Sequence, residues 1–315
     1  MLKYVIRRTL LIFPTVLFTG TIAFFVLGPA IPGDFVSTLN AGGGATMEAM
    51  EKVRDDVGLS DPLIIQYARW LGNASKGNLG YSRLRDRYVA PVVFTRLETT
   101  VTMALLSMVL SAVIAIPLGV IAAVKRGSFI DQIIRIITGI NLAMPPFWIG
   151  LIVVYTSSVK FNWIPPIYYE PIYEDPVRNL TIMAFPVISL ALSSSAVITR
   201  YMRSMTLEVL YLDYVRTARA KGLGGANLMI NHVIRNAMIP VLTMFGFYFS
   251  ITVSGVVVIE KVFNVHGVGL ELVRAVRGRD IDMILGIILA LSFLISIWIL
   301  IIDIMYAVID PRIRY

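Results

Sequence analysis

The sequence predicts an all-α polytopic membrane protein with six transmembrane helices. Its 315 residues are 57% hydrophobic and have a mean hydropathy of +0.77, which soluble domains rarely reach. Six runs without a charged side chain are each long enough to cross roughly 30 Å of hydrocarbon as a helix. These runs are Thr9–Gly33, Thr99–Val124, Ile136–Val159, Asn179–Thr199, Asn236–Ile259 and Met283–Ile302.

The first run differs from a secretory signal peptide. It is too long for an h-region, and Gly28-Pro29-Ala30 is a poor cleavage site, so we expect an uncleaved first span.

Charge distribution predicts the orientation. With the N-terminus inside, the inner and outer segments each carry 14 lysines and arginines. The positive-inside rule excludes long translocated loops, and without residues 34–98 the balance becomes 14 inside against 6 outside. We therefore expect a multi-pass membrane protein in which both termini and the 200–235 loop are cytoplasmic.

The first outer loop is too long for a simple connector. Met47–Val57 has the pattern of a helix, Asp61-Pro62 is a good helix start, and Gly77–Ser82 is predicted to be a turn. The expected division is an N-terminal transmembrane helix (1–33), a folded extracytoplasmic cap (34–98) and a five-helix core (99–315). If the cap contacts no partner protein, its role is only to stabilise the ends of the helices.

The third run contains two adjacent prolines near its middle. They remove backbone donors and predict a kink or break, and irregular backbone at membrane depth needs protein or a water-filled cavity around it. Small polar side chains in the fourth and fifth runs are a second candidate pathway lining, although such residues more often serve helix packing. The candidate pathway-lining residues are Asn141, Pro145, Pro146, Trp148, Ser194, Ser250 and Ser254.

A polar, basic segment, Leu207–Pro240, lies between the fourth and fifth runs. Its first half is predicted to be an amphipathic helix with an apolar face of Leu207, Leu210, Tyr211, Tyr214 and Ala218. Glycines at 222, 224 and 225 then interrupt it, and a second short helix is expected over about 226–236. The alternative is a solvated basic loop held by anionic lipid headgroups.

The residues of this segment, RTARAKG followed by H..RNA.IPV.T, resemble the cytoplasmic loop of ABC importer permeases of the dipeptide, oligopeptide and nickel branch. The generic pattern of those permeases is Glu-Ala-Ala, three residues, Gly, nine residues, Ile-x-Leu-Pro. Arg216-Thr217-Ala218 stand for Glu-Ala-Ala here, and Gly222 is the glycine. His232–Arg235 occupy the last four positions, so the generic proline is absent and Pro240 comes later.

The segment E..FN..G.G..L..A...RD and the ending D..YA..DPRI are also similar to that family.

The resemblance implies a permease subunit of a prokaryotic inner membrane that carries no catalytic residues. In such importers the loop forms a coupling helix that contacts an ATPase, which implies that role for Arg216, Thr217, Ala218, Arg219, Ala220, Lys221 and Gly222. The implied partners are a second homologous permease, two ATPase subunits that hold ATP and Mg²⁺, and an extracytoplasmic substrate-binding protein. The resemblance also implies that the 34–98 loop faces this binding protein. Dipeptides or oligopeptides are the expected cargo, with oligosaccharides, glutathione or nickel chelates as alternatives.

The residue inventory limits other functions. The sequence contains no cysteine, no GxxxxGK[ST] phosphate loop, no HExxH and no GxSxG, which argues against the usual catalytic constellations and against a metal site. A net charge of +8 would suggest nucleic-acid binding in a soluble protein. In a membrane protein the basic residues flank the spans, so we expect no nucleic-acid partner. An ion-coupled carrier or channel that works without an ATPase is the alternative of another class. The absence of ionisable side chains from the six runs favours an ATP-hydrolysing partner.

Overall fold

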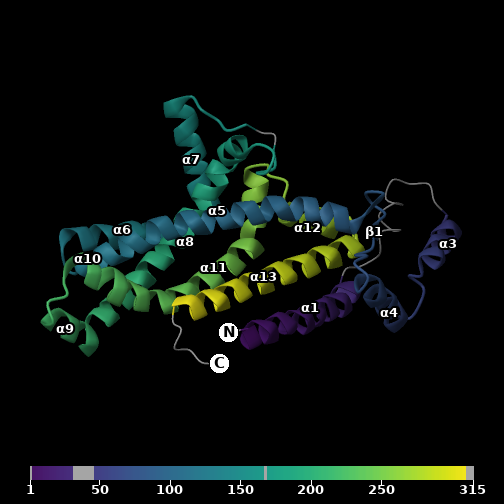
Figure 1. Ribbon diagram of the computed structural model, residues 1–315. Helices are drawn as coiled ribbons and strands as arrows, with labels where there is room; N and C mark the ends of the chain where they lie inside the picture. Colours follow the sequence, from purple (N-terminus) through teal and green to yellow (C-terminus); the bar gives the residue numbers. More distant parts are fainter. Residues whose placement is uncertain (1, 31–45, 167–168, 310–315) are drawn as a thin grey trace. The chain divides into compact units, whose positions relative to one another are not determined.

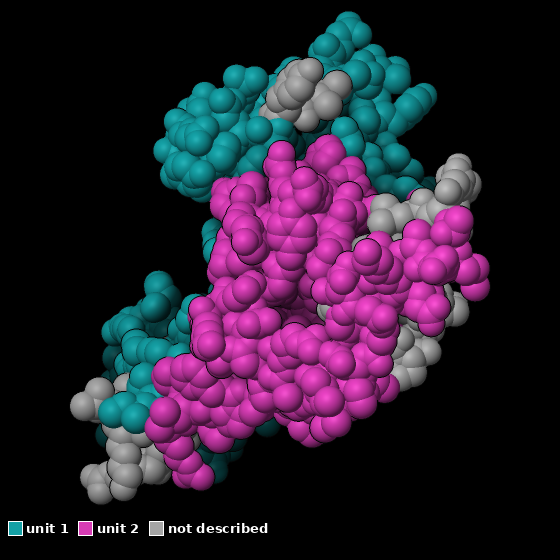
Figure 2. Space-filling model, turned by 90° about the vertical axis from the view of Figure 1, so that its right-hand side faces the viewer, with its two compact units in different colours: residues 1–6, 101–265, 298–315 teal, residues 7–100, 266–297 magenta. Residues whose placement is uncertain are grey.

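The computed structural model describes residues 2–30, 46–166 and 169–309. The chain divides into two compact units, coloured separately in Figure 2. The first comprises residues 1–6, 101–265 and 298–315, and the second comprises residues 7–100 and 266–297. Each unit is described below by itself.

Helices account for almost all of the described structure (Figure 1). The helices are α1 (Leu2–Ala30), α3 (Met47–Val57), α4 (Leu63–Ala74), α5 (Val89–Val124), α6 (Phe129–Ala143), α7 (Pro146–Phe161), α8 (Pro176–Leu210), α9 (Asp213–Ala220), α10 (Gly225–Asn227), the π-helix Leu228–Ile234, α11 (Arg235–Val262), α12 (Val268–Arg277) and α13 (Ile281–Ile309). The predicted all-α fold class is therefore confirmed. The short helix expected over 226–236 is not separate, because α10, the π-helix and α11 run on without a break.

Five helices are long and apolar enough to cross a membrane, and they contain five of the six predicted runs. They extend beyond the charge-free limits: α5 begins ten residues before Thr99, and α8 continues to Leu210. Residues 31–33 of the first predicted run lie outside the described residues. Because charged and polar side chains can lie in the interfacial region, helix ends extend further than hydropathy alone indicates.

The third predicted run is not one straight helix. α6 and α7 are bent by 105° at the residues between them. Pro145 caps α7 and Pro146 opens it, while Met144 is extended, as a residue before proline prefers. The prediction of a kink or break at the prolines is thus confirmed, and the pair counts as a sixth span only if it crosses the membrane as a unit.

α8 is the centre of the first unit. Its most apolar stretch is 67% buried, against 22–44% for the other four long helices, and it packs against α6, α7 and α11. Neighbouring helices come close to α8 at glycines, because these residues have no side chain. A Cβ at Gly119 of α5 would lie 2.6 Å from the Met202 side chain, and one at Gly150 of α7 would lie 2.6 Å from Ser189 Oγ. These contacts hold α5 and α7 close against α8.

The second unit contains the folded part of the first predicted loop. α3 has the predicted bounds, with Thr46 capping its start and Gly58 ending it at a φ of +73°. A buried cluster of Val89, Val93, Val268, Met283 and Ile287 holds the first turns of α5 against α12 and α13. Residues 46–88 thus form helices and a hairpin in the structure, whereas residues 34–45 lie outside the described residues, and the extracytoplasmic cap over 34–98 stays a prediction.

One detail of this loop differs from the prediction. The expected turn at Gly77–Ser82 leads into a small antiparallel hairpin, in which β1 (Tyr81–Ser82) pairs with β2 (Arg87–Tyr88). Ser82 Oγ donates a hydrogen bond to the Asp280 carboxylate, and the Tyr81 amide donates one of 3.3 Å to Asp282 Oδ2. The hairpin is thereby tied to the start of α13, a contact between residues about 200 positions apart that local sequence does not reveal.

Candidate functional site

The link between α8 and α9 shows where the predicted amphipathic helix is interrupted. α8 ends at Leu210 and α9 starts at Asp213, so the single helix expected from Leu207 is wrong. The predicted apolar face is also wrong, for the same reason. Tyr211, which was expected on that face, is 68% exposed, whereas Val215 is fully buried. The two-residue break changes the helical phase, and Val215 and Ala218 take the buried positions.

α9 presents a basic outer surface on a short apolar base. Arg216, Arg219 and Lys221 are exposed, as are Thr217 and Ala220, while Ala218 packs inward. Arg216 lies 3.6 Å from Asp213 in an ion pair whose side chains are 76% and 97% exposed, so solvent screens it strongly. The outer face of α9 is therefore free of strong internal ion pairs within the described structure.

A glycine ends α9 in a defined turn. The Leu223 amide donates to the Ala218 carbonyl at 3.1 Å, and the Gly222 amide donates to the Arg219 carbonyl at 3.0 Å. This pair of hydrogen bonds is a Schellman motif, in which the residue after the cap adopts the left-handed conformation. Gly222 has a φ of +83°, which side chains with a Cβ rarely adopt. The predicted glycine break is confirmed here.

Tyr214 fastens α9 to the helix that follows the break. Its hydroxyl donates to the His232 carbonyl at 2.9 Å and accepts from Asn236 Nδ2 at 2.7 Å. His232 belongs to the π-helix, whose Leu228 and Val233 side chains are buried. α9 is consequently linked through side-chain hydrogen bonds and buried apolar groups to the start of α11, one of the long apolar helices.

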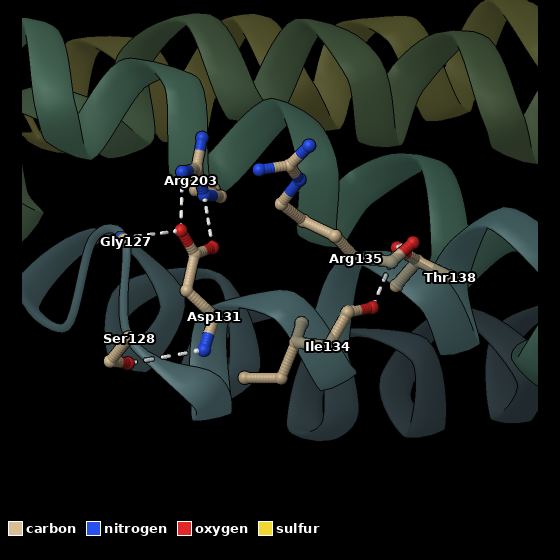
Figure 3. Close-up of polar contacts among 7 residues, drawn as sticks. All are labelled: Gly127, Ser128, Asp131, Ile134, Arg135, Thr138 and Arg203. Atoms are coloured by element: carbon tan, nitrogen blue, oxygen red, sulfur yellow. Dashed lines mark hydrogen bonds and ion pairs between the residues drawn. The ribbon is translucent and has the colours of Figure 1, made fainter.

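A buried ion pair joins α6 to α8 at the same end of the unit (Figure 3). Arg203 donates to both carboxylate oxygens of Asp131, at 2.7 and 2.8 Å, and the Gly127 amide donates to Asp131 Oδ2 at 2.9 Å. The side chain of Asp131 is 1% exposed and that of Arg203 is 21% exposed. Ser128 and Asp131 form a recognisable helix-start pattern, but nothing in the sequence indicates the partner 72 residues away.

The candidate pathway residues are distributed over α6, α7, α8, α11 and the link between α6 and α7. Asn141 Nδ2 donates to the Leu192 carbonyl at 3.2 Å, which links α6 to α8. The Ser194 and Ser250 hydroxyls bond carbonyls of their own helices, Leu190 at 2.8 Å and Gly246 at 3.2 Å. Trp148, Pro145 and Ser254 are exposed, and Pro146 is half-buried. A pathway role for these residues remains a prediction.

These observations define a helical membrane protein with a basic helix displayed between two long apolar helices. The profile of the family "Binding-protein-dependent transport system inner membrane component" matches residues 115–315, and the profile of its N-terminal region matches residues 1–104. The chain belongs to this family of ABC transporter permeases, and it is a multi-pass protein of the inner membrane.

Relatives match over the whole chain. The oligopeptide transport system permease protein AppB of Bacillus subtilis is 38% identical over 321 residues, covering 100% of both chains. A protein of Brucella abortus named as a peptide transport system permease protein is 34% identical over 315 residues, again with 100% of both chains covered. A crystal structure of an amino acid ABC transporter with histidines is similar with a TM-score of 0.49 and 16% identity, covering 71% of this chain and 94% of that chain.

Proposed function

We propose that the chain is the permease subunit of an ATP-driven importer of dipeptides or oligopeptides. The peptide cargo is supported by the names of full-length relatives such as AppB. The implied assembly pairs this chain with a second permease, two ATPase subunits beneath and a substrate-binding protein outside. ATP and Mg²⁺ are held by the ATPase subunits, and this chain carries out no chemical step.

The observation that carries the coupling role is the construction of α9. Its inner side chains, Val215 and Ala218, are buried, while its outer face displays Arg216, Arg219 and Lys221 to solvent. Tyr214 connects it to the base of α11. A short helix held in this way can transmit a push from a partner to a long helix. We therefore assign the ATPase contact to residues 216–222.

Purification of the chain from its native membranes in a mild detergent tests the assembly. Mass spectrometry is expected to find a second permease and two ATPase subunits in stoichiometric amounts, and a co-purifying binding protein would identify the cargo. Recovery of this chain alone, still active in liposomes without ATP, would instead establish a self-sufficient carrier.

The orientation can be tested because the sequence has no cysteine of its own. Single cysteines are introduced at two exposed positions, Ser75→Cys in the proposed outer cap and Ala226→Cys beside the glycine break. A membrane-impermeant maleimide added to intact spheroplasts is expected to label the Ser75→Cys protein, and to label the Ala226→Cys protein only after permeabilisation. Labelling of both in intact spheroplasts would contradict the cytoplasmic position of α9.

A further inference from the structure

An open cleft of about 560 Å³ lies in the first unit, beside the ion pair that joins α6 to α8. Its walls come from the loop after α5, the start of α6 and the last part of α8. The lining residues are Arg126, Gly127, Asp131, Arg135, Arg200, Arg203, Ser204 and Leu207. In Figure 3 the Arg135 side chain extends to the same side of α6 as the guanidinium of Arg203.

The cleft has an excess of positive charge. Four arginines and one aspartate line it, and both oxygens of Asp131 are already engaged by Arg203. Arg126 donates a 3.0 Å hydrogen bond to the hydroxyl of Tyr211, which leaves its charge uncompensated. Arg200 has no carboxylate partner within the described structure. Arg126, Arg135 and Arg200 line one cleft and form no ion pair within the described structure, so the cleft offers an environment for an anion with several oxygen acceptors, as phosphate has.

The position of the cleft indicates where such an anion would come from. Arg126 follows two residues after the apolar helix α5 ends, and Arg200 begins the polar last part of α8. The cleft thus opens at the level where apolar helices meet the headgroup region of a bilayer. α6 also carries an exposed apolar stripe formed by Ile133, Ile136, Ile137 and Ile140, which are 38–61% exposed. This stripe is suited to acyl chains.

We propose that this cleft is a binding site for the phosphate headgroup of one anionic phospholipid. The guanidinium groups of Arg126, Arg135 and Arg200 contact the phosphate, the Asp131–Arg203 pair fixes the floor of the cleft, and the acyl chains lie along the isoleucines of α6. The site is separate from the exposed face of α9 that is assigned to the ATPase contact. Arg126 nevertheless links the two regions, because it bonds Tyr211 just before α9 begins.

Lipid binding by the purified, delipidated permease complex tests the proposal. The probes are dihexanoyl phosphatidylglycerol, dihexanoyl phosphatidylcholine and inorganic phosphate, and native mass spectrometry counts bound molecules during titration. Wild type is expected to bind one phosphatidylglycerol in preference to phosphatidylcholine. Because each basic residue at a membrane surface strengthens attraction several-fold, the double variant Arg135→Gln plus Arg200→Gln should weaken that binding about 30-fold. Each single variant should have a smaller effect in the same direction.

A matched control separates a defined site from general surface attraction. Lys125→Gln removes one positive charge, as each single variant does, but Lys125 lies in the loop after α5 and does not line the cleft. It should retain nearly full phosphatidylglycerol binding, and an equal loss in Lys125→Gln and in the single variants would overturn the proposal. Two other results would also overturn it: binding of inorganic phosphate with the same dependence on the arginines but without lipid binding, and loss of the ATPase subunits from the double variant with unchanged lipid binding.

Discussion

Replacement of Gly222 by valine is expected to uncouple ATP hydrolysis from uptake while membrane insertion stays intact. The residue sits at a φ of +83° in the Schellman turn that ends α9. The left-handed conformation costs a residue with a Cβ about 1–2 kcal/mol, and more for a β-branched one, so the turn should open and α9 should lose its fixed end. A change of that size corresponds to about a 5- to 30-fold reduction in substrate taken up per ATP hydrolysed. Uptake and ATPase activity measured together in proteoliposomes report this ratio.

Gly224 supplies the matched control for this prediction. It lies two residues further on, in an extended conformation with φ −138° and ψ −179°, which valine accepts readily. A Cβ at either glycine would meet no atom within 4 Å, so crowding does not distinguish the two positions. Gly224→Val should keep a near-normal ratio of uptake to hydrolysis. Normal coupling in the Gly222→Val protein would count against the role assigned to α9.

Loss of the Asp131 carboxylate is expected to destabilise the first unit strongly. Asp131→Ala leaves the Arg203 guanidinium without its partner, in a position where it is only 21% exposed. Removing one member of a buried ion pair typically costs about 3–5 kcal/mol, and partial solvation of Arg203 reduces this to about 2–4 kcal/mol. The expected observation is a lower unfolding temperature of the detergent-purified protein, together with reduced yield.

Two comparisons separate the ion pair from general damage. Arg178→Ala breaks the Arg178–Glu170 pair in the same unit, but these side chains are 46% and 32% exposed, so the expected cost is below about 1 kcal/mol. The double variant Asp131→Leu plus Arg203→Met replaces the buried charges with apolar groups of similar size and should recover at least half of the lost stability. Equal losses for Asp131→Ala and Arg178→Ala would show that burial of the pair contributes nothing.

Sequence patterns predicted the parts of the fold that depend on local composition. Charge-free runs located the spans, the helical pattern of Met47–Val57 gave the bounds of α3, and Gly222 marked the end of α9. Hydropathy could not give the lengths of the helices, because α5 begins before its charge-free run and α8 continues after its own. It also could not show that Tyr211 and Leu212 interrupt the helix that Leu207 and Leu210 suggest.

The candidate site was predicted only in its local part. The basic residues of α9 and the glycine break were recognisable from the sequence. The hydrogen bond from Tyr214 to His232 and the Asp131–Arg203 ion pair join residues that are 18 and 72 positions apart. Neither spacing nor composition selects such partners from a sequence with 28 lysines and arginines and 20 acids. Direct contacts of this kind become visible only when the packing of α6, α8 and α11 is known.

The bend between α6 and α7 determines on which side of the membrane everything after it lies. As helices of 15 and 16 residues, α6 and α7 are each about 22–24 Å long, shorter than the roughly 30 Å of hydrocarbon that a span must cross. If the two halves cross together, the number of crossings is even and α9 shares the side of the N-terminus. If the pair enters and leaves on one side, the number is odd and α9 lies on the opposite side from the N-terminus. Whether the bent pair crosses the membrane or re-enters it therefore decides whether the N-terminus and α9 face the same compartment.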